Sequence, residues 1–367
     1  MCKDHALKGK TLVCRETGKM NRWSNEAANA WYEELPFLIG CNFLPSNASN
    51  QLEMFQSDSF DEAALRREIG WARDLGFNTL RVYLHDLLVE EEGFFGRFET
   101  FLDICRENHI TPIIVLFDDC HYGYPKLGPQ KTPIRGIHNS RWKQSPGHHI
   151  VRQIHQGSGE KELARLKNYV VSILERYKAD DRILMWDIYN EPGQFGIGDV
   201  SQTLLRAVWS WAHEVRPRQP LTSCVHGAIG SVHHDINKEN SDVLTFHMYE
   251  AEQLEESIEE LVALNRPVIC TEYMARGHGT TFQFSLPIFK KHNIGCINWG
   301  LVAGKSQTHF DWHTIMERSE RVQAEDFLLA EDALPEPDLW HHDILRADGS
   351  AFDENEVALL KEFTSTL

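Results

Sequence analysis

The stretch ILMWDIYNEPG, residues 183–193, joins a mainly apolar run directly to the tripeptide Asn190-Glu191-Pro192. The run from Ile183 to Tyr189 has the length and the aromatic and β-branched content of a buried strand. Its end is unusual, because a carboxylate stands there between an amide and a proline. The pattern predicts a buried strand that presents polar side chains at its end, and it raises the question of what they do.

Seven further runs of this kind recur along the chain, and helix-period segments lie between them. The runs span residues 37–44, 78–84, 111–117, 221–227, 243–249, 267–273 and 295–301, and the helical segments span 61–76, 96–109, 161–178, 200–215, 252–265 and 281–293. Strands that are apolar on both faces and alternate with amphipathic helices indicate a parallel sheet covered by helices. Eight such units predict an α/β protein with a closed (β/α)8 TIM barrel in a single domain.

An open doubly wound sheet is the alternative fold. Such a sheet usually carries a glycine-rich phosphate loop after its first strand. Here the first strand runs into GCNFLPSN, residues 40–47, which has no G-x-G-x-x-G pattern. The sequence therefore favours the barrel.

The predicted barrel spans residues 37–367 and follows an N-terminal extension of residues 1–36, in which 24–35 has the pattern of a helix that packs on the barrel floor. Two connections are much longer than the others, 118–159 after the third strand and 302–352 after the eighth. In a barrel, the loops that follow the strands form the rim of the active site. The alternative is that these loops are variable surface decoration.

Composition limits the classes of partner. The chain has 367 residues, 42% of them hydrophobic and 25% charged, and no stretch approaches the roughly 18 consecutive apolar residues of a membrane span. The formal net charge of -17 argues against nucleic acid and anionic membranes, which bind through clustered Lys and Arg. A neutral or cationic partner fits this charge better.

The cysteines and the N-terminus predict a reducing compartment. Of eight cysteines, Cys41, Cys224, Cys270 and Cys296 lie inside apolar strand-like runs, where a free thiol behaves as a small hydrophobe. We therefore expect reduced thiols rather than a disulfide framework. The first 19 residues contain no apolar segment of signal-peptide length, which favours a cytoplasmic location.

Polar residues stand at the ends of several predicted strands, where a barrel brings them to one cleft. Strand four ends in Asn190 and Glu191, and strand seven carries Glu272. Two carboxyl groups in different protonation states suit cleavage of a glycosidic bond, because one protonates the departing oxygen while the other supplies negative charge near the oxocarbenium-like carbon. Cationic and hydroxyl groups such as Arg81 and Tyr249 favour an ionised carboxylate, whereas apolar surroundings raise the pKa of a carboxyl group.

These residues carry a family resemblance. The chain resembles the retaining glycosidases of glycoside hydrolase clan A and is most similar to glycoside hydrolase family 5, the cellulases and mannanases. The resemblance extends from GCN, residues 40–42, to the segment 339–356, and its most specific feature is Asn-Glu-Pro at the end of strand four together with Glu272 at the end of strand seven. It implies that Glu191 is the general acid and base, that Glu272 is the nucleophile, and that Asn190 donates to the sugar 2-hydroxyl.

The resemblance also implies a substrate-binding set. Arg81 and Tyr249 would hold Glu272, His247 would line the cleft near the reacting sugar, and Trp299 would stack beneath it. The remaining members of the expected set are Asn42, Asp118 and Asp119. Four alternatives stay open: Arg81 forms a structural ion pair with Asp187, Trp299 fills the core, His247 is a hydrogen-bonded structural residue, and Asp118-Asp119 caps the loop rather than contacting substrate. The pair His85-Asp86 is not expected to be catalytic.

Three rival functions remain. The first is a metal-dependent barrel hydrolase, prompted by 19 histidines, although strand one offers no histidine and the adjacent pairs at 148–149, 233–234 and 341–342 fall in loops. The second is a carbohydrate-binding barrel without catalysis. The third is a transglycosylase that uses the same two glutamates. The chemistry predicted from the glutamates requires no metal and no organic cofactor, and the sequence leaves open the sugar, the linkage, exo or endo action and the role of the 118–159 loop.

Overall fold

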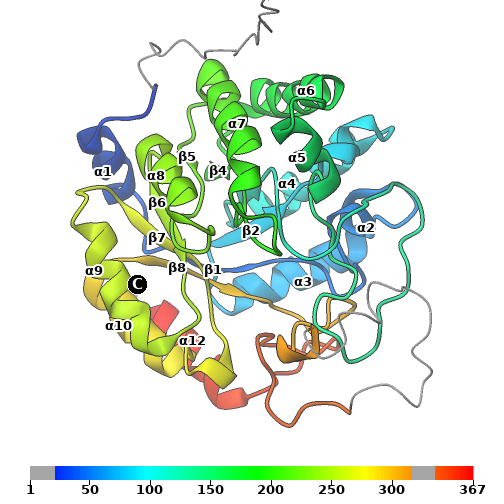
Figure 1. The fold of residues 1–367 in the computed structure, drawn as a ribbon. Coiled ribbons are helices and arrows are strands. Elements are labelled where there is room, and N and C mark those ends of the chain that lie inside the picture. Colours follow the sequence, from blue (N-terminus) through cyan, green and yellow to red (C-terminus); the bar gives the residue numbers. More distant parts are fainter. Residues whose placement is uncertain (1–20, 316–334, 367) are drawn as a thin grey trace, which may run out of the picture.

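Eight parallel strands form one sheet in the order β5-β4-β3-β2-β1-β8-β7-β6 in the computed structural model, which describes residues 21–315 and 335–366 (Figure 1). The strands are β1 (Ile39–Asn42), β2 (Thr79–Tyr83), β3 (Ile113–Val115), β4 (Met185–Asp187), β5 (Leu221–Thr222), β6 (Leu244–His247), β7 (Val268–Tyr273) and β8 (Gly295–Trp299). The seam between β5 and β6 is closed just beyond β5, where Val225 N donates to Thr245 O at 2.8 Å and His247 N donates to His226 O at 2.9 Å. The predicted (β/α)8 TIM barrel is confirmed.

The regular strands are shorter than the apolar runs that predict them. The run 183–189 contributes only Met185–Asp187 to the regular ladder. Beyond it the backbone still bonds to its neighbours, since Ile188 N donates to Thr222 O at 2.8 Å and Asn190 N donates to Phe117 O at 2.7 Å. Extended but irregular chain therefore carries the polar tripeptide to the rim of the barrel.

The register of β1 against β2 depends on a glycine. Gly40 pairs with Thr79, and a Cβ atom at position 40 would lie 1.9 Å from the Thr79 carbonyl oxygen. Only glycine permits this close approach of the two strands. The adjacent pairs of the same register place Asn42 beside Arg81 at the carboxyl ends of β1 and β2.

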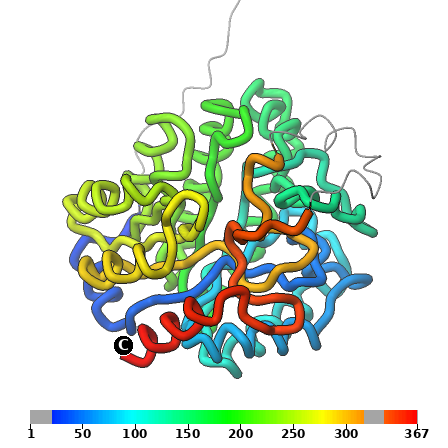
Figure 2. Tube along the Cα trace, turned by 90° about the horizontal axis from the view of Figure 1, so that it is seen from below, coloured from blue at the N-terminus to red at the C-terminus, as the bar shows by residue number. Residues whose placement is uncertain are grey.

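Helices form the outer ring. The six predicted helical segments coincide, to within two residues at each start, with α3 (Glu62–Asp74), α4 (Phe94–Glu107), α6 (Glu160–Tyr177), α7 (Gln202–Val215), α9 (Leu254–Val262) and α10 (Phe282–His292). Apart from the helix before β1, four described helices lie outside those segments: α2 (Gln51–Phe55), α5 (His148–His155), α8 (Ser231–Asn240) and α12 (Glu354–Ser365). Short 3-10 turns follow strands or precede helices: η1 (Asp86–Glu90), η2 (Gly198–Ser201), η3 (Ala251–Gln253) and η4 (Arg276–His278). Helix α12 closes the ring between α10 and α3, where Thr364 Oγ1 donates to Leu75 O at 3.3 Å (Figure 2).

The extension before β1 contains helix α1 (Asn25–Glu33). Trp31 and Tyr32 of this helix, with Leu35, pack against apolar residues at the amino ends of the strands: Leu38, Ile113, Leu184, Met185, Val243, Ile269 and Ile297. The Tyr32 hydroxyl accepts a hydrogen bond from Gly295 N at 2.8 Å. Residues 1–20 of the predicted extension lie outside the described residues.

The two long connections after β3 and β8 contact each other at the carboxyl ends of the strands. Gln307 Nε2 donates to Ile134 O at 2.7 Å, and Asn139 N donates to Ser306 O at 2.8 Å. The connection after β3 includes helix α5, and residues 316–334 of the connection after β8 are not among the described residues. Within the described ranges, no helix is long and apolar enough to cross a membrane.

Candidate active site

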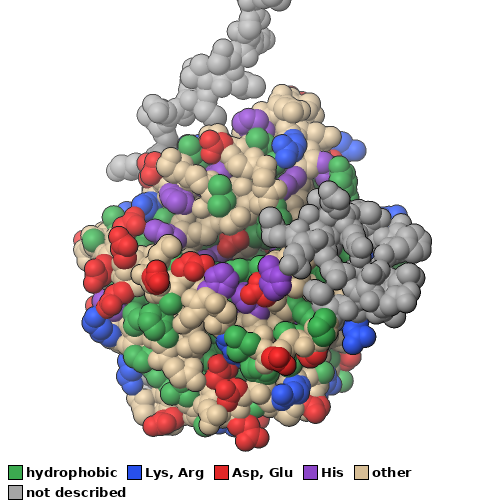
Figure 3. All heavy atoms as spheres, turned by 60° about the horizontal axis from the view of Figure 1, so that its bottom comes forward, with side chains coloured by type: hydrophobic (Ala, Val, Ile, Leu, Met, Phe, Trp, Pro, Cys, Tyr) green, Lys and Arg blue, Asp and Glu red, His purple; other side chains and the backbone are tan. Residues whose placement is uncertain are grey.

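A cleft of about 720 Å³ opens at the carboxyl ends of the strands. Glu191, Glu272, His247, Tyr249 and Trp299 all line it, together with Asp118 and Asn190. His and acidic side chains gather near the middle of the face that Figure 3 shows. The strand ends therefore bring most of the sequence-predicted site residues to one hollow.

The Glu272 carboxylate, on β7, is surrounded by donors. Arg81 Nη1 donates to Oε1 at 2.7 Å, Tyr83 OH donates to the same oxygen at 2.8 Å, and Tyr249 OH donates to Oε2 at 2.7 Å. One cation and two hydroxyl groups thus replace the water that a buried carboxylate loses. This environment holds the carboxylate in a fixed orientation.

Arg81 serves both roles that the sequence leaves open. Its fully buried guanidinium donates to Asp187 Oδ2 at 2.7 Å and to Glu272 Oε1 at 2.7 Å. It also donates to Asn42 Oδ1 at 2.9 Å and to Asn190 Oδ1 at 2.7 Å. Arg81 therefore forms a structural ion pair with Asp187, and it also orients Glu272 from behind the cleft.

Glu191 lies in a less polar setting. Cys120 Sγ donates to Glu191 Oε2 at 2.9 Å, and His247 Nδ1 lies 2.7 Å from Glu191 Oε1. Burial raises the pKa of Glu191 to about 7, although the Cys120 hydrogen bond and the charge of Arg81 act in the opposite direction. A carboxyl group of this kind is protonated for much of the time near neutral pH.

The backbone at Glu191 is strained. Its φ of 42° lies in the left-handed region, which costs a non-glycine residue about 1–3 kcal/mol. Asp119 supports the turn, because its carboxylate accepts from Gly193 N at 2.8 Å, from Tyr189 OH at 2.8 Å and from the Ser201 hydroxyl. Burial raises the pKa of Asp119 to about 6.

Three members of the expected substrate-binding set therefore lie outside the cleft lining: Asn42, Asp119 and Arg81, which contacts Glu272 from behind the cleft. Asp119 caps the turn that carries Glu191, the alternative that the sequence leaves open, and it is 1% exposed. Asn42 lies behind the cleft, where it accepts from Arg81 and donates to the Thr271 carbonyl at 2.8 Å. All three residues position catalytic candidates rather than face the space for substrate.

Asn190 is fixed at both ends of its amide. Its Oδ1 accepts from Arg81, and its Nδ2 donates to Asp118 Oδ1 at 2.9 Å. Asp118 in turn accepts from Trp142 Nε1 at 2.6 Å. Burial raises the pKa of Asp118 to about 7, while the donors Asn190 and Trp142 act to lower it. Residues of β2, β4 and the connection after β3 thus share one hydrogen-bond network.

Glu191 and Glu272 are close neighbours. One carboxylate oxygen of Glu191, one of Glu272 and one ring nitrogen of His247 lie within 4.8 Å of one another. Burial lowers the pKa of His247 to about 4, so its imidazole is neutral near pH 7. Among the described residues, two groups of three His or acidic side chains are close enough to bind a metal ion, and this is one of them. Chelation is therefore the test of the metal-dependent alternative.

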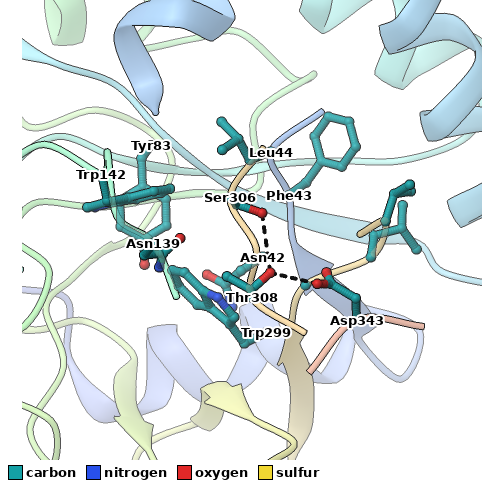
Figure 4. A pocket seen from close by; sticks show the side chains of 13 residues that line it. Asn42, Phe43, Leu44, Tyr83, Asn139, Trp142, Trp299, Ser306, Thr308 and Asp343 are labelled. Atoms are coloured by element: carbon teal, nitrogen blue, oxygen red, sulfur yellow. Dashed lines mark hydrogen bonds between the residues drawn. The ribbon is translucent and has the colours of Figure 1, made fainter. Parts of the chain in front are cut away.

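Aromatic side chains form one wall. Trp299 is half-buried, and its ring centroid lies 5.9 Å from Tyr83 and 5.8 Å from Trp142. Trp299, Trp142 and Asn139 line the cleft and also a small cavity of about 20 Å³ behind it (Figure 4). Tyr124 of the same connection as Trp142 is 79% exposed and stacks on His149 outside the cleft lining.

Sequence reasoning missed three residues of the site. Tyr83 follows Arg81 by two positions on β2, and the period of a strand places both on one face, so a signal was present. Cys120 and Trp312 lie in the connections after β3 and β8, where no periodic pattern predicts which side chain reaches the cleft. The pair His85-Asp86, which was not expected to be catalytic, anchors the connection after β3, since Ser145 Oγ donates to Asp86 Oδ1 at 2.8 Å.

Solved structures with the same fold include several that act on mannosides. The exo-beta-1,4-mannosidase Op5Man5 from Opitutaceae bacterium strain TAV5 has a TM-score of 0.60 and 15% identity over 90% of this chain, which spans 60% of that enzyme's length. The hyperthermostable endo-1,4-beta-D-mannanase from Thermotoga petrophila RKU-1 has a TM-score of 0.56 and 14% identity over 90% of this chain and all of its own. A GH5_18 protein from Streptomyces cattleya in complex with Manβ1-4GlcNAc has a TM-score of 0.56 and 12% identity over 90% of this chain and 80% of its own. At these identities the likeness shows the fold.

No curated protein matches the chain in sequence. The family model described as cellulase, glycosyl hydrolase family 5, matches residues 48–305, more than half of the chain. That range contains the Asn190-Glu191-Pro192 turn and Glu272. The chain therefore belongs to glycosyl hydrolase family 5.

Proposed function

We propose that the protein is a retaining β-glycoside hydrolase that cleaves a neutral β-linked glycan by double displacement, with Glu191 as acid and base and Glu272 as nucleophile. Membership of family 5 supports a glycoside hydrolase and a carbohydrate substrate. The observation that carries the finer proposal is the contrast between two carboxyl groups within 4.8 Å of each other. One is surrounded by donors, and the other is buried with a raised pKa.

The spacing supports retention. Retaining glycosidases hold their carboxyl groups about 5–5.5 Å apart, whereas inverting enzymes need roughly 6.5–9.5 Å to admit a water molecule. In the first step the Glu272 carboxylate forms a bond to the anomeric carbon, the glycosidic bond breaks, and the Glu191 proton passes to the departing oxygen. In the second step Glu191 takes a proton from water, the resulting oxygen bonds to the anomeric carbon, and Glu272 is released.

The surrounding residues have distinct roles in this scheme. Arg81, Tyr83 and Tyr249 orient Glu272 for attack. Asn190 offers its amide nitrogen toward the sugar 2-hydroxyl, although that nitrogen already donates to Asp118 at 2.9 Å and would share its hydrogens between the two. Trp299 presents an indole face to the apolar side of a pyranose ring.

Two other outcomes use the same residues. A transglycosylase would transfer the sugar from Glu272 to a sugar hydroxyl instead of water, and product analysis at high acceptor concentration distinguishes the two. A carbohydrate-binding barrel without catalysis would bind sugar and turn over nothing. The hydrogen bonds that hold Glu272 support catalysis over this second alternative, because binding alone does not require a fixed, desolvated carboxylate.

Covalent trapping tests the proposal. The protein is incubated with 2-deoxy-2-fluoro glycosides of β-manno, β-gluco, β-xylo and β-galacto configuration, digested and mapped by mass spectrometry. The expected label lies on the peptide that contains Glu272, and the configuration that labels fastest identifies the sugar. The Glu272→Gln variant is the matched control and should stay unlabelled. A label on another residue would overturn the nucleophile assignment, and full activity after exhaustive chelation would exclude the metal-dependent alternative.

A further inference from the structure

A second cluster of metal-ligating side chains lies beside the cleft, behind Trp312. It consists of His278 in η4, Asp311 in the connection after β8, and His341 in the segment before α12. One ligand atom from each of the three residues lies within 4.8 Å of the others. Asp311 Oδ2 and His341 Nδ1 are only 3.2 Å apart. Three segments far apart in the sequence therefore direct two imidazoles and a carboxylate to one point.

The outer contacts of His278 and Asp311 each occupy only one potential ligand atom of the side chain. His278 Nδ1 lies 2.8 Å from Glu250 Oε1, which leaves the other ring nitrogen available. Asp311 Oδ1 accepts from His313 N at 2.9 Å and lies 2.8 Å from His313 Nδ1, which leaves Oδ2 toward His341. A carboxylate held against the far nitrogen of a ligating histidine is a regular feature of metal sites, where it fixes the ring and raises its basicity.

The burial of the three residues is graded from inside to outside. His341 is 2% exposed, and its ring lies 4.2 Å from His342 and 4.6 Å from Trp312 between centroids. The side chains of His278 and Asp311 are 31% and 34% exposed. The cluster thus has a fixed inner ligand and two outer ones that solvent reaches, so an ion can enter and keep a water molecule as its fourth ligand.

We propose that His278, Asp311 and His341 form a binding site for one divalent transition-metal ion, with Zn²⁺ as the ion that fits best. Two imidazoles and one carboxylate match the ligands of Zn²⁺, whereas Ca²⁺ and Mg²⁺ take oxygen ligands. The separation of 3.2 Å between Asp311 Oδ2 and His341 Nδ1 suits two ligands each about 2.0–2.1 Å from one ion. One ring nitrogen of His278, within 4.8 Å of a ligand atom of each of the other two, completes the set.

The ion would stabilise one wall of the cleft. Trp312 follows Asp311 directly and lines the cleft, and its ring centroid lies 4.7 Å from Tyr249. Tyr249 in turn donates to Glu272. An ion that ties Asp311 to His278 and His341 therefore fixes Trp312 against the residue that orients Glu272. The metal has a structural role here, and the site is separate from the pair of glutamates.

Metal binding tests the proposal independently of any glycosidase activity. The full chain without an affinity tag is stripped of metal, and Zn²⁺ is titrated by calorimetry, with the absorption spectrum of the Co²⁺-loaded protein as a second measurement. We expect one Zn²⁺ per chain and a Co²⁺ spectrum without thiolate bands. His278→Gln and Asp311→Asn alter side chains that are only partly buried. Each should weaken Zn²⁺ binding at least about tenfold, as should Glu250→Gln through the outer contact.

Two control variants separate this site from others. His155→Ala removes an exposed histidine of α5, and Glu272→Gln removes one member of the other group that is near enough to bind a metal. Both should bind Zn²⁺ as the unmodified protein does. The proposal is overturned if the unmodified chain binds no Zn²⁺ at micromolar concentration. It is also overturned if His278→Gln and Asp311→Asn bind Zn²⁺ unchanged, or if Glu272→Gln alone abolishes binding.

Discussion

His247 Nδ1 lies 2.7 Å from Glu191 Oε1 and 3.6 Å from Glu272 Oε2, so one neutral imidazole stands between the two carboxyl groups. The nearer carboxyl group is the one with the raised pKa, and the farther one is held by Arg81, Tyr83 and Tyr249. The imidazole therefore adds no charge to the pair and leaves the difference between the two carboxyl groups intact. This difference should determine both the pH dependence of the reaction and its dependence on the leaving group.

The pH dependence should follow Glu191. Burial raises the pKa of Glu191 to about 7, so the protonated form that donates to a leaving group predominates below that pH and is lost above it. We expect kcat/KM for a substrate with a poor leaving group to fall above about pH 7, by about tenfold for each further pH unit. The measurement is a pH profile of kcat/KM between pH 4 and 9. A profile that keeps rising between pH 7 and 9 would contradict the role of Glu191 as acid.

The two glutamates should respond differently to the leaving group. Glu191→Gln removes the proton donor, so it should lower kcat/KM by about 10²–10⁴ for an alkyl glycoside but far less for a dinitrophenyl glycoside, whose anion departs without a proton. Glu272→Gln removes the nucleophile and should abolish turnover of both substrates. Kinetics of both variants on matched alkyl and dinitrophenyl glycosides provide the test. Equal losses for the two substrates in Glu191→Gln would count against the assignment.

Cys120 should tune the acid. Its thiol donates to Glu191 Oε2 at 2.9 Å, and this hydrogen bond lowers the pKa of Glu191 against the larger effect of burial. In Cys120→Ala the bond is lost, so the pKa of Glu191 rises and the basic limb of the kcat/KM profile moves to higher pH. Cys105→Ala is the control, because Cys105 is also buried but lies in the apolar core on α4. If the basic limb of the Cys120→Ala profile falls at the same pH as that of Cys105→Ala, or at a lower pH, Cys120 does not tune the pKa of Glu191.

The fold was predictable because both of its determinants are periodic in the sequence. Two-sided apolar runs identify the strands, and helix-period segments identify seven of the helices, α1 among them. Helix α8 (SVHHDINKEN) lacks an apolar stripe, since its buried residues include His233, Asn237 and Asn240, and so the pattern gives no signal there. The ends of the regular strands were also not predictable. Beyond each end the chain stays extended and keeps backbone hydrogen bonds to its neighbours outside the regular ladder, so the apolar run continues past the strand.

The residues of the candidate site also fall into predictable ones on strands and unpredictable ones in irregular loops. Residues on strands, such as Arg81, Glu272 and His247, were found because a barrel sends strand ends to one cleft. Cys120 was missed, and Asp119 was expected at the substrate, because the direction of a side chain in an irregular loop depends on contacts far apart in sequence. The bond from Gly193 N to Asp119 Oδ2 is one such contact, 74 positions apart.

Arg81 should be a determinant of stability as well as of activity. Its buried guanidinium pairs with Asp187 and Glu272, and removal of one partner of a buried ionic group typically costs about 3–5 kcal/mol because the remaining charges are uncompensated. We therefore expect Arg81→Met to lower the free energy of unfolding in urea by about this amount. Arg66→Met is the matched control, since Arg66 also pairs with two carboxylates, Glu62 and Glu107, but its side chain is 45% exposed. Exposed pairs contribute about 0–1 kcal/mol, so that variant should stay near the unmodified protein. Equal free energies of unfolding for the two variants would show that Arg81 does not offset the charge of these buried carboxylates.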